Sequence, residues 1–249
     1  MKSEFFLRLA DLALPGLPAG PITSVESQRK VIRAIEDEYQ LFRRIGELVV
    51  TLEGELVRVA FTSDDRINPI DVAISELQAG RVSEGIELLQ FLYANSPDDP
   101  NVLYLLGSSL SDLGNLAQAE SHLRRALEIR PNFPEALVNL GVALMRMNKT
   151  DEAVEILKKA VKLDSKNAFA HRNLGACIFK LGGDIATAQA HLEQAVQLAP
   201  EDIQSWLGLA GVYKAQGRTA AAKKACTTVL QIAPQSPLAP HARTMLQHL

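Results

Sequence analysis

The sequence predicts an all-α solenoid, a stack of helix-turn-helix repeats. Three observations support this prediction. Small and apolar residues return about every 34 residues between Asn101 and Ser236, and a period of this length is typical of repeat architectures. Each period contains two segments in which apolar residues recur at three- and four-residue steps, as on one face of a helix. A glycine or an asparagine separates the two segments in every period.

Several columns keep the same kind of residue through four consecutive repeats. In the first helix of each repeat, leucine is followed by a small residue, and in the second helix an alanine recurs. These columns are Leu106, Leu140, Leu174 and Leu209; Gly107, Gly141, Gly175 and Ala210; and Ala119, Ala153, Ala188 and Ala222. Small residues allow two helix backbones to approach closely, and a bulky side chain there costs about 1 to 3 kcal/mol. One such hairpin cannot bury its apolar face alone, so the repeats must stack.

The third repeat illustrates the pattern. Its helices are predicted at about Pro134 to Met147 and at about Thr150 to Leu163. The turn between two such helices needs a residue that tolerates a left-handed backbone, and glycine is the usual choice. The other three repeats have glycine at this turn, whereas the third has Asn148. The turn residues are Gly114, Asn148, Gly182 and Gly217.

These motifs resemble the tetratricopeptide repeat family, from about Arg66 to the C-terminus. The resemblance implies a right-handed superhelix with a concave groove, and protein binding as its function. The expected units are a degenerate repeat at 66–99, repeats at 100–133, 134–167, 168–202 and 203–236, and a capping helix at 237–249. The sequence departs from the pattern where Ser165 replaces a proline, Ala210 replaces a glycine and Gly183 adds one residue to a turn.

Residues 1–22 precede the repeats as an amphipathic segment and a proline-rich linker. We expect a helix from Ser3 to about Leu14 that either docks on the protein or anchors it to a membrane surface or partner. Charged residues interrupt the apolar run, which argues against a secretion signal. No stretch reaches the length of apolar residues that a membrane span requires.

Residues 23–65 are predicted to form a long helix or a helical hairpin. Thr23 and Glu26 have the spacing of a capping box, which typically starts a helix. Apolar residues then recur at three- and four-residue steps, which indicates a seam for another helix. They are Ile32, Ile35, Tyr39, Phe42, Ile45, Val49, Leu52 and Leu56. The segment either caps the first repeat or forms a dimerisation element.

Composition limits the class of function. Hydrophobic residues make up 47% of the chain, the net charge is −3 and the pI is about 6.0, which argues against a nucleic-acid-binding protein. Cys177 and Cys226 lack a metal-ligand spacing and are expected to be free structural thiols, which suits the cytoplasm. The sequence contains none of the common nucleotide-binding, hydrolase or metalloprotease motifs. We therefore expect no enzymatic activity, no cofactor and no metal site.

The family resemblance also implies which residues line the groove, because the first helix of each repeat faces it. The candidate peptide-binding residues are Tyr104, Ser108, Asn139, Val142, Arg146, Phe169, Arg172, Asn173, Lys180 and Lys214. Asn139 and Asn173 occupy one column and either contact a peptide backbone or cap local hydrogen bonds. Basic residues outnumber acidic ones in this set, which favours an acidic or mixed apolar ligand.

The sequence thus predicts a scaffold or adaptor without enzymatic activity that binds an extended peptide segment of a protein partner in the groove. Two alternatives remain open. One is a self-assembling scaffold whose N-terminal helix forms homo-oligomers. The other is a regulatory subunit of a separately encoded enzyme.

Overall fold

The computed structural model describes residues 2–8, 25–53, 56–64 and 67–249. The chain divides into two compact units, Met1–Val102 and Leu103–Leu249.

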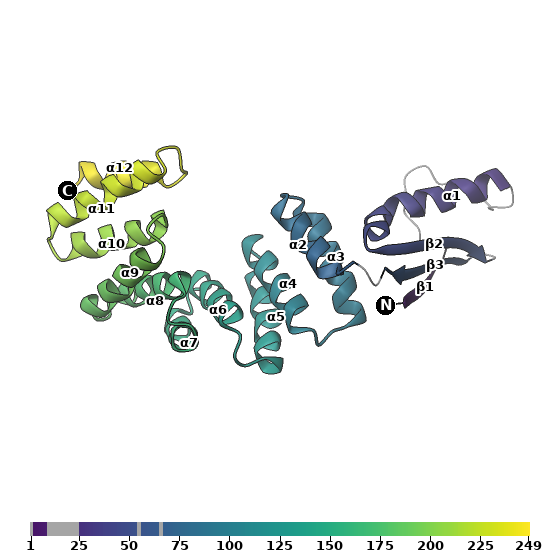
Figure 1. Ribbon diagram of the computed structural model, residues 1–249, viewed down its shortest axis with the longest axis horizontal. Helices are drawn as coiled ribbons and strands as arrows, with labels where there is room; N and C mark the ends of the chain where they lie inside the picture. Colours follow the sequence, from purple (N-terminus) through teal and green to yellow (C-terminus); the bar gives the residue numbers. More distant parts are fainter. Residues whose placement is uncertain (1, 9–24, 54–55, 65–66) are drawn as a thin grey trace. The chain divides into compact units, whose positions relative to one another are not determined.

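The first unit begins with a small α/β module, which is followed by two helices (Figure 1). Three antiparallel strands form one sheet in the order β1-β3-β2. Helix α1 packs on one face of this sheet through Val31 and Ile35, both fully buried. The elements are β1 (Lys2–Arg8), α1 (Val25–Glu38), the 3-10 helix η2 (Gln40–Arg44), β2 (Gly46–Glu53), β3 (Leu56–Ser63), α2 (Pro69–Gln78) and α3 (Val82–Asn95).

The prediction of one long helix or a helical hairpin over residues 23–65 is therefore wrong: α1 ends at Glu38, the short 3-10 helix η2 follows, and two strands occupy 46–53 and 56–63. Leu48, Val50 and Leu52 pack against α1 from alternate positions of β2, which is the period of a strand with one buried face. The three- and four-residue spacing of Val49, Leu52 and Leu56 arises by coincidence across two strands. The helix predicted from Ser3 is also wrong at residues 2–8, which form β1; its remaining residues lie outside the described part.

An aromatic cluster joins this α/β module to α3. Phe42 of η2, Phe61 of β3 and Phe91 of α3 meet in pairs. The rings of Phe61 and Phe91 are perpendicular, with their centroids 5.3 Å apart, and those of Phe42 and Phe91 are 4.6 Å apart. These separations are typical of favourable edge-to-face contacts. The α/β module therefore shares a hydrophobic core with the helices that follow it.

Ion pairs among three side chains also connect the α/β module to the helices that follow it. The side chain of Glu76 in α2 is fully buried and pairs with both Arg44 of η2 and Arg81. The hydrogen bond from Arg81 and the positive charge of Arg44 lower the pKa of Glu76, and burial opposes this effect only in part. Removing one partner of a buried ion pair is generally destabilising. Glu76 is thus kept charged at neutral pH and fixes α2 against η2.

The second unit consists of stacked helical hairpins, as predicted. Helix α6 pairs with α7, α8 with α9 and α10 with α11, and α12 packs on α11. Helix α4 pairs with α5, where Gly107 lies against Leu123 and Ala119. Figure 1 shows these helices following one another along the unit. The helices are α4 (Pro100–Asp112), α5 (Leu116–Ile129), α6 (Pro134–Arg146), α7 (Thr150–Leu163), α8 (Ala168–Lys180), α9 (Ile185–Leu198), α10 (Ile203–Ala215), α11 (Thr219–Ile232) and α12 (Ala239–Gln247).

The predicted columns form the core of the second unit. All four leucines of the first-helix column are no more than 2% exposed, and the four column alanines of the second helices are fully buried. The turn residues adopt the left-handed backbone that was predicted, including Asn148, the one non-glycine residue with positive φ in the described part. Helix α12 lies within the range predicted for a capping helix, and its Ala239 and Ala242 are buried.

Candidate functional site

The first helices of the repeats form the candidate site. Helix α8 packs against both α6 and α10, and Arg146 of α6 bonds to the carbonyl of Ser111 in α4, so the four first helices follow one another along the unit. We call the surface on which the sequence predicts the groove the A-helix face. It comprises Tyr104, Ser108, Asn139, Val142, Arg146, Phe169, Arg172, Asn173, Lys180 and Lys214.

The two asparagines of the shared column have different environments. Asn139 forms a hydrogen bond with the phenol of Tyr104, whose pKa is raised mainly by burial. Asn173 is only 6% exposed, and its amide nitrogen Nδ2 is buried without a hydrogen-bond partner in the described part of the chain. A buried donor without a partner is rare and costly in a folded protein. The Nδ2 donor of Asn173 is therefore an unmet donor, which makes no hydrogen bond within the described residues.

Phe169 lies one helical turn before Asn173, on the same face of α8. Its side chain is 56% exposed, which makes it one of the few large apolar side chains at the surface of the described residues. The guanidinium carbon of Arg172 lies 5.0 Å from the centre of the Phe169 ring, within the range of a cation–π contact. An exposed ring and an unmet donor thus lie side by side.

Three of the four predicted groove cations are bonded within the protein, and two of them, Arg146 and Lys180, bond to the preceding repeat. Arg172 pairs with both carboxylate oxygens of Asp202, at 3.0 and 3.1 Å. Arg146 donates to the backbone carbonyl of Ser111. Lys180 donates to the backbone carbonyl of Met145, at 3.3 Å, and to the Oδ1 atom of Asn148, at 3.0 Å.

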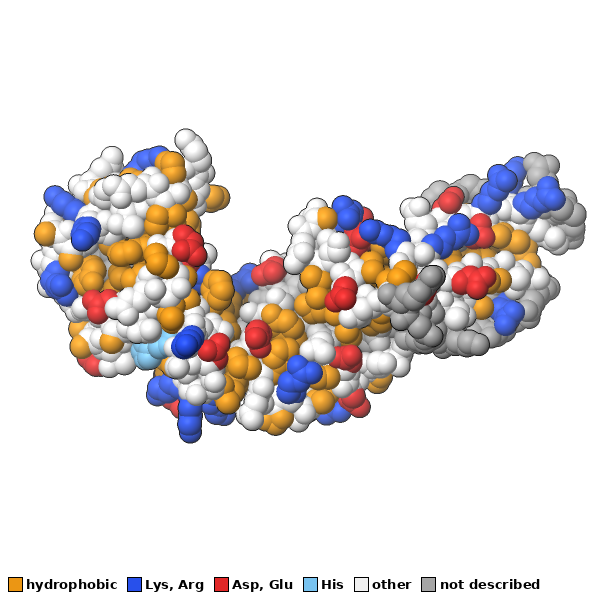
Figure 2. All heavy atoms as spheres, viewed as in Figure 1, with side chains coloured by type: hydrophobic (Ala, Val, Ile, Leu, Met, Phe, Trp, Pro, Cys, Tyr) orange, Lys and Arg blue, Asp and Glu red, His pale blue; other side chains and the backbone are white. Residues whose placement is uncertain are grey.

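These bonds have a structural role that the sequence did not indicate. Arg146 and Lys180 stand at equivalent positions of successive repeats, and each reaches the last turn of the preceding first helix. A cation is favourable there because the carbonyl groups at a helix C-terminus lack partners within the helix. The prediction of an acidic ligand assumed that these cations were free. Because they are bonded within the protein, they give less support to that prediction. On the face drawn in Figure 2, basic and acidic side chains are interspersed among hydrophobic ones.

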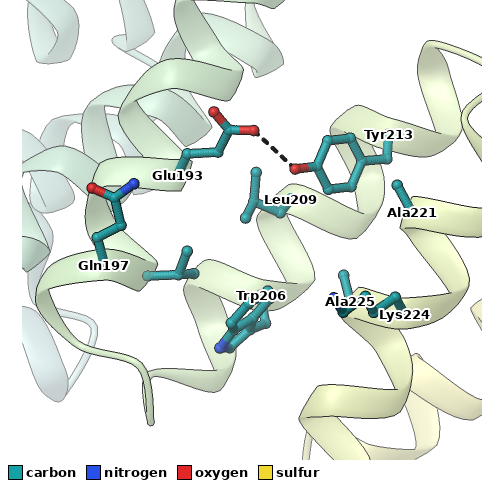
Figure 3. A pocket seen from close by; sticks show the side chains of 9 residues that line it. Glu193, Gln197, Trp206, Leu209, Tyr213, Ala221, Lys224 and Ala225 are labelled. Carbon is teal, nitrogen blue, oxygen red and sulfur yellow. Dashed lines mark hydrogen bonds between the residues drawn. The ribbon is translucent and has the colours of Figure 1, made fainter.

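Two further features were not predicted as sites. His171 and His191 meet in the α8–α9 hairpin, with their Nδ1 atoms 3.0 Å apart, and His171 also contacts the carbonyl of Ser165 through Nε2. Burial, followed by the neighbouring His171, lowers the pKa of His191. The two side chains therefore pack against each other within one hairpin. The second feature is a hollow between α9, α10 and α11 (Figure 3).

Cys177 and Cys226 are free and buried, and burial raises the pKa of the Cys177 thiol to about 11, as expected of structural thiols. Within the described residues, three or more histidine, cysteine or acidic side chains nowhere gather as metal ligands would. The helices of the described part are all too short or too polar to cross a membrane.

Stacked hairpins with these columns and left-handed turns define a tetratricopeptide-repeat solenoid. Residues 88–231, more than half of the chain, match the family model described as the Cilia and flagella-associated protein 70 middle TPR-like domain, and the chain belongs to this family. Among curated proteins, none matches the sequence significantly.

Solved structures of tetratricopeptide-repeat proteins share the fold. TTC0263, a thermophilic protein of Thermus thermophilus, is 24% identical with a TM-score of 0.61, and the match covers 72% of this chain and 98% of that one. MamA 41-end from Desulfovibrio magneticus RS-1 is 22% identical with a TM-score of 0.56, covering 68% and 95%. YrrB, described as having an unusual peptide-binding site, is 17% identical with a TM-score of 0.54, covering 72% and 92%. Such a fold supports protein–protein interaction in general.

Proposed function

We propose that this protein is a scaffold without enzymatic activity that binds an extended segment of a partner protein on the A-helix face. The observation that carries the proposal is the pairing of the exposed Phe169 ring with the unmet donor of Asn173 on one face of α8. An extended backbone offers carbonyl acceptors at regular intervals, and rotation of the amide would let Asn173 donate to one of them. An apolar side chain of the ligand would cover Phe169.

The chemistry of the ligand depends on which groove cations are not already bonded within the protein. Because Arg146, Arg172 and Lys180 are bonded within the protein, they contribute less to the binding of an acidic ligand than free cations would. Lys214 on α10 is exposed and is available to an acidic group at one end of the face. We therefore propose a mixed apolar segment with an acidic residue toward α10. A reducing compartment such as the cytoplasm suits the two free thiols.

Replacing Asn173 with alanine is expected to weaken ligand binding while leaving the fold as stable or more stable. The variant removes a buried donor that makes no bond, and such a removal can be neutral or stabilising. Peptides selected from a displayed random library on the full chain should lose about tenfold or more in affinity for Asn173→Ala, which corresponds to about 1.4 kcal/mol. Phe169→Ala should have a similar effect on binding.

Leu163→Ala is the matched control, because Leu163 is 43% exposed on a second helix, α7, away from the A-helix face. Its affinity for the same peptides should be unchanged. If the peptides bind Asn173→Ala and Phe169→Ala as tightly as the unaltered chain, they bind elsewhere and the proposed groove is wrong.

Self-assembly is a second candidate function, favoured by strand β2. Within the described residues β2 pairs only with β3, and Val49 is 42% exposed on the sheet face away from α1. Apart from its two glutamates, β2 contains no charged residue and no proline, the residues that usually protect an edge strand from pairing with another chain. We propose that an assembly of this protein would form through this edge.

A Val49→Lys variant tests self-assembly. If the full chain is a dimer or larger by light scattering after size exclusion, this variant is expected to reduce it to a monomer. A point change is preferable to deleting the α/β module, because the deletion would expose Phe91 and remove Arg44 from Glu76. A monomeric unaltered chain, or an assembly that tolerates Val49→Lys, would exclude the β2 edge.

A further inference from the structure

A hollow of about 290 Å³ lies between α9, α10 and α11, away from the A-helix residues discussed above. Figure 3 shows α9 and α11 as its two walls and α10 as its floor, with the Trp206 ring and the Leu209 side chain between them. The lining is mostly apolar, with a carboxylate on one wall and an ammonium group on the other. The lining residues are Glu193, Val196, Gln197, Trp206, Leu209, Tyr213, Ala221, Lys224 and Ala225.

The hollow arises because the fifth repeat has a small residue at a position where the preceding repeats have a bulky one. Trp206 and Ala225 stand at positions that pair across the two helices of the fifth repeat. The corresponding pairs in the two preceding repeats both have a bulky second member: His171 with His191, and Leu137 with Ile156. Ala225 lacks that bulk, so a space remains beside the Trp206 ring. The hollow is therefore a specific feature of the fifth repeat.

The carboxylate in this pocket is held in place. Glu193 accepts hydrogen bonds at Oε1 from the hydroxyl of Tyr213, at 2.9 Å, and from the side-chain amide of Gln189, at 2.7 Å. Gln189 is in turn bonded by Gln216, at 2.8 Å. Burial and this bond to Glu193 raise the pKa of Tyr213, so the phenol remains a donor. The second carboxylate oxygen, Oε2, has no bond among the described residues.

The aromatic rings in the pocket present apolar surface. The indole nitrogen of Trp206 donates to the carbonyl of Pro200, at 2.8 Å, which satisfies its polar edge and leaves the ring for the pocket. Lys224 stands on the opposite wall, but its side chain is exposed, and a long exposed lysine moves away from an incoming cation at little cost. Glu193 is half-buried and held by two hydrogen bonds, so it dominates the charge that a ligand meets.

We propose that this pocket binds a bulky apolar side chain that lies next to a cation in a basic, apolar segment of a partner protein. The apolar group fills the space beside Trp206, and the ammonium or guanidinium group bonds to Oε2 of Glu193. A carboxylate held by a hydrogen-bonded network loses little freedom on binding, which favours affinity, and its bonds with a cation are charge-assisted. This second surface is independent of the proposed A-helix groove.

Two small probes test the proposal. Phenethylammonium combines an aromatic ring with a cation, and 3-phenylpropionate has a similar ring with a carboxylate. Trp206 is the single tryptophan of the chain, so its fluorescence reports occupancy directly. We expect a saturable change with phenethylammonium in the millimolar range, as is usual for ligands of this size. Binding of 3-phenylpropionate should be at least about fivefold weaker.

Variants of two lining residues complete the test. Glu193→Gln keeps an acceptor for Tyr213 and should weaken phenethylammonium by at least about fivefold, while Ala225→Leu should fill the pocket and abolish its response. Ala220→Leu, at an exposed site on α11 outside the lining, is the control and should bind as the unaltered chain does. The proposal is overturned by equal binding of both probes, by no response to either, or by Ala225→Leu behaving like Ala220→Leu. Because Ala225→Leu leaves the A-helix face intact, peptide binding there tests the proposed function separately.

Discussion

Replacing Gly141 with leucine is expected to destabilise the second unit by about 3 kcal/mol. A Cβ atom at Gly141 would lie 2.5 Å from Cγ of Leu157 and 2.7 Å from its Cδ2, closer than real side chains approach. Leu157 is fully buried, so it cannot move aside without displacing its neighbours. The midpoint of thermal unfolding should fall by about 6 to 12 °C, measured by circular dichroism or calorimetry.

Gly211→Ala is the matched control for this prediction. A Cβ atom there would meet only Cε1 of Phe179 at 3.5 Å, an ordinary contact, and alanine is favoured over glycine within a helix by up to about 1 kcal/mol. Adding Leu157→Ala to Gly141→Leu should restore part of the lost stability, because it removes the clashing atoms. Equal melting of Gly141→Leu and Gly211→Ala would show that the hairpin helices are not in close contact.

Replacing Phe61 with alanine is expected to cost the first unit about 3 to 5 kcal/mol. Phe61 is only 2% exposed and contacts both Phe42 and Phe91, so the variant removes a core side chain and two aromatic contacts. Since these contacts join the α/β module to α3, the amides of β2 and β3 should exchange hydrogen much faster. Hydrogen exchange measured by mass spectrometry resolves these segments.

A control variant and a control region show whether the effect of Phe61→Ala is confined to the core of the first unit. Val49→Ala changes an exposed position of the same sheet and should alter the stability by only about 0.5 kcal/mol. Protection in α6 to α11 should be unchanged in Phe61→Ala, because those helices belong to the other compact unit. A uniform loss of protection over the whole chain would mean that the two units unfold together.

The repeats could be predicted from sequence because their contacts recur. The same residue types return at a fixed spacing, so each copy supports the interpretation of the others, and Leu140, Ala153 and Asn148 all have the environments that their columns indicate. The bounds predicted for the second helix of the third repeat, Thr150 to Leu163, are those of α7. In a periodic fold, agreement among the copies therefore supports the structure predicted for each one.

The α/β module has no such repetition, and its prediction failed for a local reason. Strands β2 and β3 are rich in valine, and within them the buried Leu48, Val50, Val57, Val59 and Phe61 alternate with less buried residues, which is typical of strands. The apolar residues were instead interpreted at helical spacing, because Val49, Leu52 and Leu56 continue the series that begins in α1. The valine content and the alternation of Val57, Val59 and Phe61 were the signals that would have identified β3.

Part of the chemistry of the candidate site could not be predicted from the sequence. The sequence placed Arg146 and Lys180 on the first helices, but it could not indicate that they bond to backbone carbonyls of the preceding repeat, because every residue has a carbonyl. Similarly, the pocket beside Trp206 depends on the absence of bulk at Ala225. Comparing that column with His191 and Ile156 would have indicated it.

The bonds from Arg146 and Lys180 also bear on how such a chain changes in length during evolution. Both reach 35 residues back along the sequence, so each connects a repeat only to its immediate neighbour. If a segment of one repeat were duplicated, the cation of the new copy would meet the same kind of backbone carbonyl on the preceding first helix. Deleting one would likewise leave matching surfaces in contact. We therefore expect that whole repeats can be gained or lost in single genetic steps while these bonds form again at the new junction, which would change the length of the proposed binding face.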